Sequence, residues 1–141
     1  MDPVKAVHEL RPKVADSEKI TINLGYVDLG QIELLVAEGF YANRTDFIRT
    51  AIRNQLDRHS DAVRQSTARR AVELGLRRVT RAELETARDV GRPIDLRVLG
   101  IASIAEDVTP ELAKAAIASV SVLGALQASA AVKAALADRT A

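Results

Sequence analysis

The segment 17-SEKITINL-24 decides how the rest of the chain is interpreted, because its side chains alternate in character. Successive side chains of an extended strand point to opposite faces of a sheet. Such a strand needs a cover for its apolar face and hydrogen-bond partners for its backbone. The two faces would be an apolar one of Ile20, Ile22 and Leu24 and a polar one of Lys19, Thr21 and Asn23.

Two helices are expected directly after this strand. The first is predicted to begin at Asp28, a plausible N-cap, and to end at Gly39, which suits the left-handed position that follows a helix. The second is predicted over residues 44–59, with Asn43 as its N-cap. Asp46 falls at the third helical position, where a carboxylate complements the cap and the helix dipole.

The partner that this strand lacks is most simply the same strand from a second chain. Strand and helices span residues 17–59, too few to bury a core alone. An antiparallel pair across a two-fold axis would satisfy both backbones and place both apolar faces on the helices. The polar residues would then form the outer surface of a two-stranded ribbon, which fits the major groove of B-DNA. We therefore expect a homodimer with double-stranded DNA as its partner.

The pattern KITINL…LGQIELLVAEGFYANRTDFIRTAIRNQL resembles the ribbon-helix-helix regulators of the CopG/Arc/MetJ superfamily, over roughly residues 17–59. The resemblance implies that alternate strand residues read bases and that the turn before the second helix binds a DNA phosphate. A free helix N-terminus suits the second role, because its N–H groups and positive partial charge attract anions. The implied base-reading residues are Lys19, Thr21 and Asn23, and the implied phosphate-binding residues are Asn43, Arg44 and Thr45.

Each of these residues also has a plainer interpretation. The polar strand residues could be the wet face of an edge strand. Asn43 is a helix cap whatever else it does, and the two residues after it could be ordinary surface residues. Arg49 and Arg53 are expected to be solvated, or paired with Asp46 and Asp57 across a helical turn, rather than bound to DNA.

Charge and residue composition divide the rest of the sequence into further segments. Residues 1–16, with two prolines and mixed charge, are predicted to be a flexible N-terminal arm. Residues 61–92 hold eight arginines against five acidic residues. Residues 60–92 are therefore predicted to be an Arg-rich helical connector, in which Thr80 caps a second short helix. This connector is either a solvated spacer or an added phosphate-binding or partner-binding element.

The C-terminal segment, residues 93–141, carries a short internal repeat. VLGIAS at 98–103 and VLGALQ at 122–127 recur with a period of 24 residues, and a helix is predicted after each. Thr109 and Pro110 mark the start of the first of these helices. Such a repeat predicts parallel strands, but two repeats cannot bury their faces alone. We therefore predict a βα-repeat module for oligomerisation, in which copies from different chains stack. A small lobe packed on its own chain and an effector pocket are the alternatives.

Composition narrows the possible chemistry. The chain has 141 residues, a net charge of +1, 48% hydrophobic residues and 3% aromatic residues, as is typical of a folded, Ala-rich, helical protein. The absence of cysteine excludes disulfides and thiolate metal sites and suits a reducing cytoplasm. His8 and His59 are far apart with no carboxylates at ligand spacing, so we predict no metal site. We also predict no catalytic set, cofactor or membrane span.

The sequence as a whole predicts a mainly α protein with short strands, in which an intertwined ribbon-helix-helix dimer carries a small C-terminal oligomerisation module. The predicted function is a sequence-specific DNA-binding transcriptional regulator, in the first place a repressor, which acts in the cytoplasm on the nucleoid and is not an enzyme. Two alternatives remain open. One is the antitoxin of a toxin–antitoxin pair, whose tail masks a toxin, and the other is a structural protein whose tail polymerises.

Overall fold

The computed structural model describes residues 17–141 and divides the chain into two compact units, Met1–His59 and Ser60–Ala141. The predicted N-terminal arm, residues 1–16, lies outside the described residues, as does His8. We describe each unit by itself.

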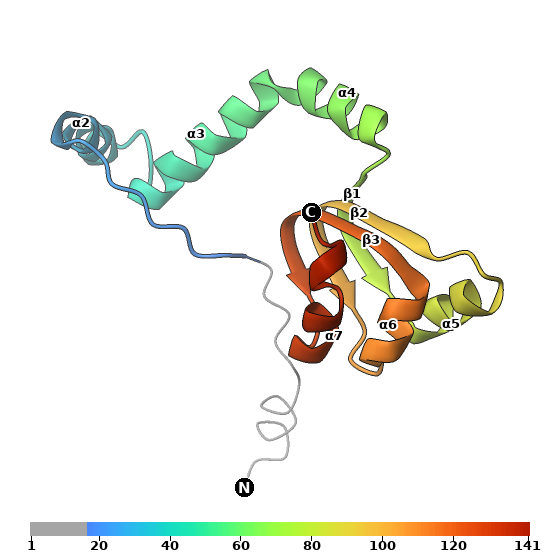
Figure 1. The fold of residues 1–141 in the computed structure, drawn as a ribbon. Coiled ribbons are helices and arrows are strands. Elements are labelled where there is room, and N and C mark those ends of the chain that lie inside the picture. Colours follow the sequence, from blue (N-terminus) through green and yellow to red (C-terminus); the bar gives the residue numbers. More distant parts are fainter. Residues whose placement is uncertain (1–16) are drawn as a thin grey trace, which may run out of the picture. The chain divides into compact units, whose positions relative to one another are not determined.

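The N-terminal unit holds an extended segment and two helices. Residues 17–25 form no helix and no strand ladder in the single chain. Helix α2 spans Tyr26–Ala37 and helix α3 spans Arg44–Arg58 (Figure 1). The second helix therefore begins where the sequence predicts. The strand expected over residues 18–24 has no ladder within one chain, because no described residue pairs with it.

The first helix begins earlier than its sequence predicts. Asp28 is not the N-cap but lies in the first turn, and Gly25 occupies the cap position without a side-chain hydrogen bond. The end of the helix is as expected, since Gly39 has φ of +86°. The amide of Phe40 donates to the carbonyl of Leu35 at 3.0 Å, and the amide of Gly39 donates to Val36 at 3.1 Å. This is a Schellman ending, which requires a left-handed residue at the turn.

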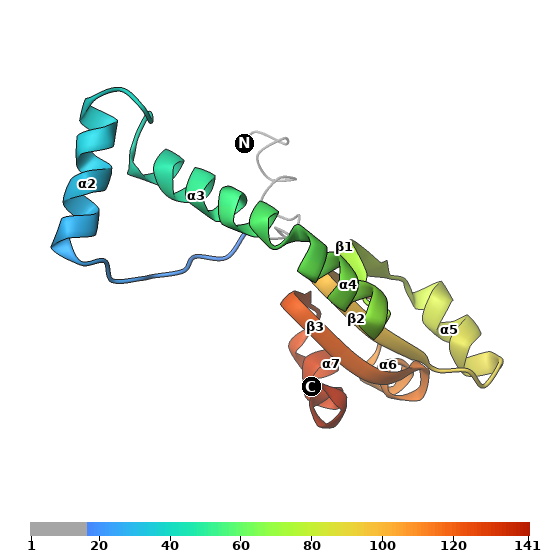
Figure 2. The ribbon, with the colours of Figure 1, turned by 90° about the horizontal axis from the view of Figure 1, so that it is seen from above.

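The C-terminal unit is built on a three-stranded parallel sheet in the order β1-β2-β3. Each strand is followed by a helix, and α5, α6 and α7 pack on one face of the sheet (Figures 1 and 2). The elements are α4 Ser60–Arg70, β1 Glu73–Val79, α5 Arg81–Asp89, β2 Ile94–Ile104, α6 Pro110–Ala116, β3 Ile117–Gln127, α7 Ala130–Ala135 and a 3-10 turn Ala137–Arg139.

Strand β1 corrects the prediction of a wholly helical connector over residues 60–92. Helix α4 ends at Arg70, Ala71 has φ of +51°, and the chain then enters the sheet. Of the spaced apolar residues that suggest a helix, Ala62 and Ala68 do lie on α4, whereas Leu76 lies in the strand. The repeat therefore has three copies within one chain. The unit meets the requirement for about three stacked repeats by itself, so the prediction that a two-repeat module must stack on another chain loses its premise.

A row of glycines crosses the sheet. Gly75 pairs with Gly100, which pairs with Gly124, and all three have φ between +113° and +135°. A Cβ at Gly100 would lie 2.2 Å from the carbonyl oxygen of Gly75, and one at Gly124 would lie 2.0 Å from that of Gly100. A Cβ at Gly75 would meet nothing within 4 Å. Both the backbone conformation and the close approach of the strands therefore require glycine at the second and third positions.

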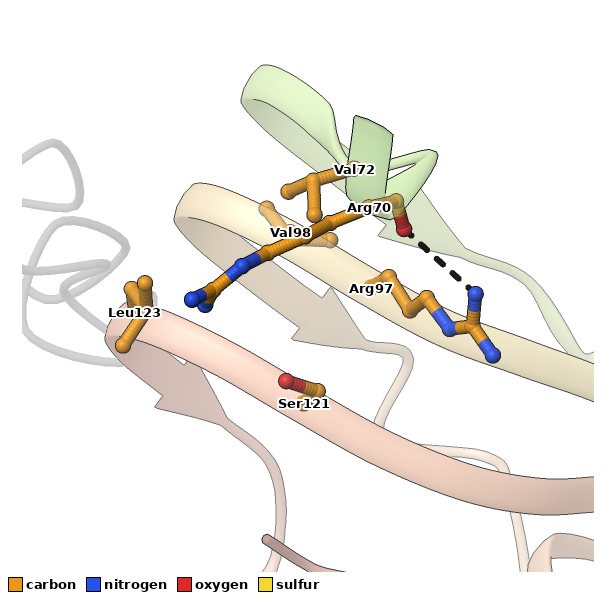
Figure 3. A pocket seen from close by; sticks show the side chains of 6 residues that line it. All are labelled: Arg70, Val72, Arg97, Val98, Ser121 and Leu123. Atoms are coloured by element: carbon orange, nitrogen blue, oxygen red, sulfur yellow. Dashed lines mark hydrogen bonds between the residues drawn. The ribbon is translucent and has the colours of Figure 1, made fainter. Parts of the chain in front are cut away.

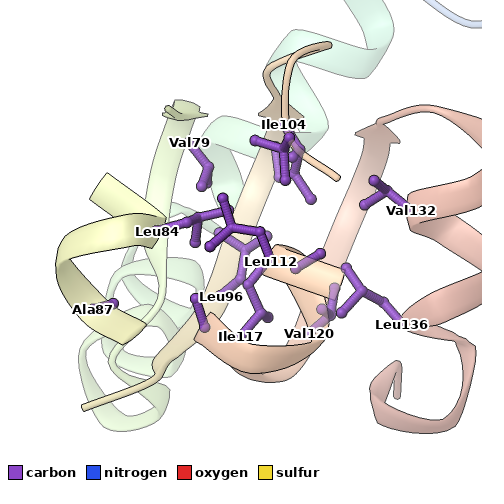
Figure 4. Packing of buried hydrophobic residues seen from close by; sticks show 14 of the residues in the cluster. Val79, Leu84, Ala87, Leu96, Ile104, Leu112, Ile117, Val120, Val132 and Leu136 are labelled. Atoms are coloured by element: carbon purple, nitrogen blue, oxygen red, sulfur yellow. The ribbon is translucent and has the colours of Figure 1, made fainter. Parts of the chain in front are cut away.

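The core of this unit lies between the sheet and its three helices. Figure 4 shows side chains from all of these elements meeting in one layer. The largest fully buried side chains come from both the strands and the helices: Leu84, Leu96, Ile117, Leu136, Val79, Val98, Val120 and Val132. The predicted caps Thr80 and Thr109 accept hydrogen bonds from the amides of Glu83 at 3.2 Å and Leu112 at 3.1 Å, which fixes where α5 and α6 begin.

Candidate nucleic-acid interface

The extended segment of the N-terminal unit exposes both of its faces in the single chain. Residues 17–24 are all exposed, including Lys19, Thr21 and Asn23. The apolar side chains between them are exposed as well, by 79% for Ile20 and 63% for Ile22. An extended backbone with one apolar face and no ladder is open to pairing with another strand.

The two helices do not provide that cover alone. Ile32 is the one described residue of the unit that is buried, and α3 buries none of its residues. Exposed apolar side chains lie on the extended segment, on both helices and in the turn between them, namely Ile20, Ile22, Leu24, Tyr26, Val27, Leu34, Phe40, Ile52 and Leu56. Residues 17–59 therefore bury too little apolar surface within one chain to offset the conformational entropy of folding.

The start of α3 combines a side-chain cap with a second polar contact. The amide of Asp46 donates to Oδ1 of Asn43 at 2.8 Å, as the sequence predicts. The carboxylate of Asp46 accepts from the amide of Ala42 at 3.0 Å. The rings of Tyr41 and Phe47 meet edge to face with centroids 5.0 Å apart, which holds the turn against the helix. The turn is thus fixed by contacts on both sides of its polar residues.

Arg44 and Thr45 follow the cap, at the first two positions of α3, and both are exposed. Nη1 of Arg44 lies 3.5 Å from Oε1 of Glu33 on α2. Both side chains of this ion pair are more than half exposed, so it contributes little to stability and leaves the guanidinium free to turn toward an anion. The sequence shows no sign of this pair, because its members are brought together by the turn between two helices.

The arginines farther along α3 are exposed. In the described part of the chain, Arg49 and Arg53 form no ion pair with Asp46 or Asp57. Of the two predicted alternatives, the structure shows exposure to solvent and not pairing. Four of the eight arginines between residues 60 and 92 do pair with carboxylates, namely Arg64, Arg77, Arg81 and Arg88.

Arg77, on β1, has a structural role in the C-terminal unit. Its Nη1 donates to Oε2 of Glu83 on α5 at 3.1 Å, and its Nε lies 3.4 Å from Oε2 of Glu73. The hydrogen bond to Glu83 and the charges of both carboxylates raise the pKa of Arg77. This side chain therefore ties β1 to α5 and is not available to DNA.

A pocket of about 270 Å³ lies between α4 and the sheet (Figure 3). Nη1 of Arg97 donates to the carbonyl of Arg70 at 3.4 Å. This bond ties β2 to the end of α4, and the guanidinium of Arg70 lies on the other side of the pocket, toward Leu123, so the two cations do not converge on one point. The lining residues are Arg70, Val72, Arg97, Val98, Ser121 and Leu123. The two arginines are 27 positions apart, so the sequence did not indicate that they would meet.

Other kinds of site find no support within residues 17–141. No group of three or more His, Cys, Asp or Glu side chains there is arranged to hold a metal ion. Over the same residues, no helix has both the length and the apolar character that crossing a bilayer requires.

Comparison with known protein families identifies the family of this chain. A family model described as the ribbon-helix-helix transcriptional regulator family matches residues 15–133, which is most of the chain and includes the C-terminal sheet. Neither the curated proteins nor the solved structures gave a match.

Proposed function

Because this chain belongs to the ribbon-helix-helix transcriptional regulator family, we propose that it binds specific DNA sites as a dimer and represses transcription from them. Two copies of residues 17–24 would pair antiparallel, with Ile20, Ile22 and Leu24 against the helices. The paired strands would lie in the major groove, where Lys19, Thr21 and Asn23 would contact base edges. The family membership supports a regulator without an enzymatic role.

The observation that carries this proposal is the exposed, unpaired segment at residues 17–24 on a unit that buries a single described side chain. A second chain would supply the missing ladder and the missing core at once. The same pairing would bring Lys19, Thr21 and Asn23 of both chains to one outer surface. This pairing would account at once for the alternation at residues 17–24 and for the single buried side chain among the described residues of the unit.

The turn before α3 would position the ribbon on the DNA backbone. The amides of Arg44 and Thr45 lie at the start of the helix, where unpaired N–H groups point away from the helix body. With the Thr45 hydroxyl and the Arg44 guanidinium they would hold one phosphate. The carboxylate of Asp46 is at the same end, so this contact depends on Arg44 for its net attraction.

The C-terminal unit would raise occupancy by joining copies, so that several ribbons engage a repeated operator together. Its buried core and capped helices argue against the antitoxin alternative, in which a tail that is disordered until bound masks a toxin. We place the protein in the cytoplasm, on the nucleoid, because that is where a repressor of this kind would act.

The test is a gel-shift selection on genomic fragments with the full chain and single variants. We expect Thr21→Ala and Asn23→Ala each to lose about 1–3 kcal/mol at the preferred site and to relax the sequence preference. Arg44→Ala should weaken all fragments alike and lower the salt dependence by about one phosphate contact. The control is Lys133→Ala, which removes one positive charge from the exposed surface of α7. It should leave the affinity and its salt dependence unchanged. An unaltered sequence preference in both strand variants would contradict base reading by the ribbon.

A further inference from the structure

The outer edge of β1 is an unpaired strand edge. β1 lies at the end of the sheet and pairs with β2 alone. At the opposite end of the sheet, the chain's own C-terminus covers the start of β3, because Thr140 bridges Val120 and the amide of Ala141 donates to Val120 at 2.9 Å. Nothing within residues 17–141 covers β1 in this way. An edge of this kind is a template for another strand.

The sequence of β1 is self-complementary about Gly75. Residues 73–77 are Glu-Leu-Gly-Leu-Arg, which has leucine on both sides of the glycine and opposite charges at the two ends. In an antiparallel pair of two such strands with Gly75 on the two-fold axis, Glu73 faces Arg77 of the partner copy. Leu74 then faces Leu76 of the partner copy. Opposite charges and apolar pairs at directly opposed positions both stabilise a sheet.

The structure places these side chains on the faces that such a pair needs. Arg77 points to the helix side of the sheet, where it bonds Glu83, and Glu73 lies beside it with 64% of its side chain exposed. Leu74 and Leu76 are 73% and 64% exposed and belong to no core contact. Two copies would therefore bring ion pairs together on one face and leucines together on the other.

Gly75 leaves room for a second backbone at the centre of this edge. At Gly100 and Gly124 the space of a Cβ is filled by the carbonyl oxygen of the preceding strand, 2.2 and 2.0 Å away. The same space at Gly75 holds nothing within 4 Å. The conformation that admits a neighbouring strand at the other two positions is thus present at the edge without one.

We propose that β1 pairs antiparallel with β1 of a second copy of this chain, about a two-fold axis at Gly75, and joins two three-stranded sheets into one of six strands. The β1 edge would be the surface through which copies of the chain assemble in the proposed function. The biological role of the pairing rests on that proposed function. The pairing itself is a property of the free protein and is tested without DNA.

The test uses cysteine pairing, to which the chain is suited because it has no cysteine of its own. Leu74→Cys and Leu76→Cys chains with different affinity tags are expressed alone and together, then oxidised mildly. Directly opposed positions have Cβ atoms about 4.5–5.5 Å apart, while diagonal ones are about 7–8 Å apart, too far for a disulfide. We expect efficient disulfides in the mixture and at least fivefold less in either variant alone.

Three results would overturn the proposal. One is efficient cross-linking of Leu76→Cys by itself, which places the axis elsewhere. Another is cross-linking of Leu76→Cys with Ala125→Cys, which indicates a parallel contact between β1 and β3 of different copies. The third is cross-linking no faster than that of Val90→Cys, an exposed position at the end of α5 that reports chance encounters. Gel shifts of the reduced cysteine variants measure DNA binding separately from β1 pairing. A failure of cross-linking therefore counts against β1 pairing alone, whereas the proposed DNA-binding function is tested by the Thr21→Ala gel shift.

Discussion

Replacing Gly100 by alanine tests the glycine row most severely. Gly100 has φ of +135°, a conformation that costs a residue with a Cβ about 1–3 kcal/mol. Its Cβ would also lie 2.2 Å from the carbonyl oxygen of Gly75. That oxygen belongs to a strand backbone and cannot rotate away, so the strands must separate, which adds about 1–3 kcal/mol or more. We expect Gly100→Ala to destabilise the C-terminal unit by roughly 2–6 kcal/mol.

The matched control is Gly91→Ala in the same unit. Gly91 also has a positive φ, +69°, but a Cβ there would meet nothing within 4 Å. Only the conformational cost of about 1–2 kcal/mol should remain. Urea unfolding followed by circular dichroism measures both free energies of unfolding. Gly124→Ala, whose Cβ would lie 2.0 Å from the Gly100 oxygen, should behave like Gly100→Ala. Equal losses in Gly91→Ala and Gly100→Ala would refute the reasoning from strand contact.

Two further predictions concern the helices. Asn43→Ala removes the side chain that accepts from the amide of Asp46, so thermal unfolding of the N-terminal unit should show a loss of about 1 kcal/mol, whereas Asn43→Ser should stay within a few tenths. Leu84→Ala empties a fully buried position on α5 and should cost about 2–5 kcal/mol in urea unfolding, against under about 0.5 kcal/mol for Val90→Ala, which is 63% exposed. Similar losses for Leu84→Ala and Val90→Ala would show that this core is misassigned.

The parts of the fold that depend on local chemistry could be predicted from the sequence. Asn43, Thr80 and Thr109 cap helices because each precedes a helical run and bonds an amide three residues later. Gly39 ends α2 for a similarly local reason, since it takes the left-handed position. The start of α2 was predicted wrongly, because Asp28 satisfies a cap pattern that the chain does not use.

Strand β1 was missed because its signal is weak on its own. Seven residues with three charges, Glu-Leu-Gly-Leu-Arg-Arg-Val, lie within an Arg-rich stretch whose spaced apolar residues also fit a helix. The signal that could have found it is a Leu-Gly pair that recurs at residues 74–75, 99–100 and 123–124. The register of the sheet aligns these three pairs. A repeat with spacings of 25 and 24 residues is harder to detect than a strict period.

In the candidate site too, local features could be predicted from the sequence and tertiary contacts could not. The sequence could indicate which residues alternate at 17–24 and which residues start α3, because both are local patterns. It could not indicate the ion pair between Arg44 and Glu33, or the meeting of Arg70 and Arg97, because tertiary contacts bring these residues together. The pairing of the extended segment with a second chain, which the alternation at residues 17–24 predicts, stays a prediction, because the structure holds one chain.

The most direct test of the account is a search for contacts between chains at residues 18–24. Isotope-filtered nuclear Overhauser spectra of dimers made from one labelled and one unlabelled chain report only distances between chains. An antiparallel ribbon brings Cα protons of the two strands close together at alternate positions. We expect such cross-strand signals among Glu18, Ile20, Ile22 and Leu24 or among the residues between them. Spectra with no signals between chains for this segment, recorded on a sample that still binds DNA, would contradict it.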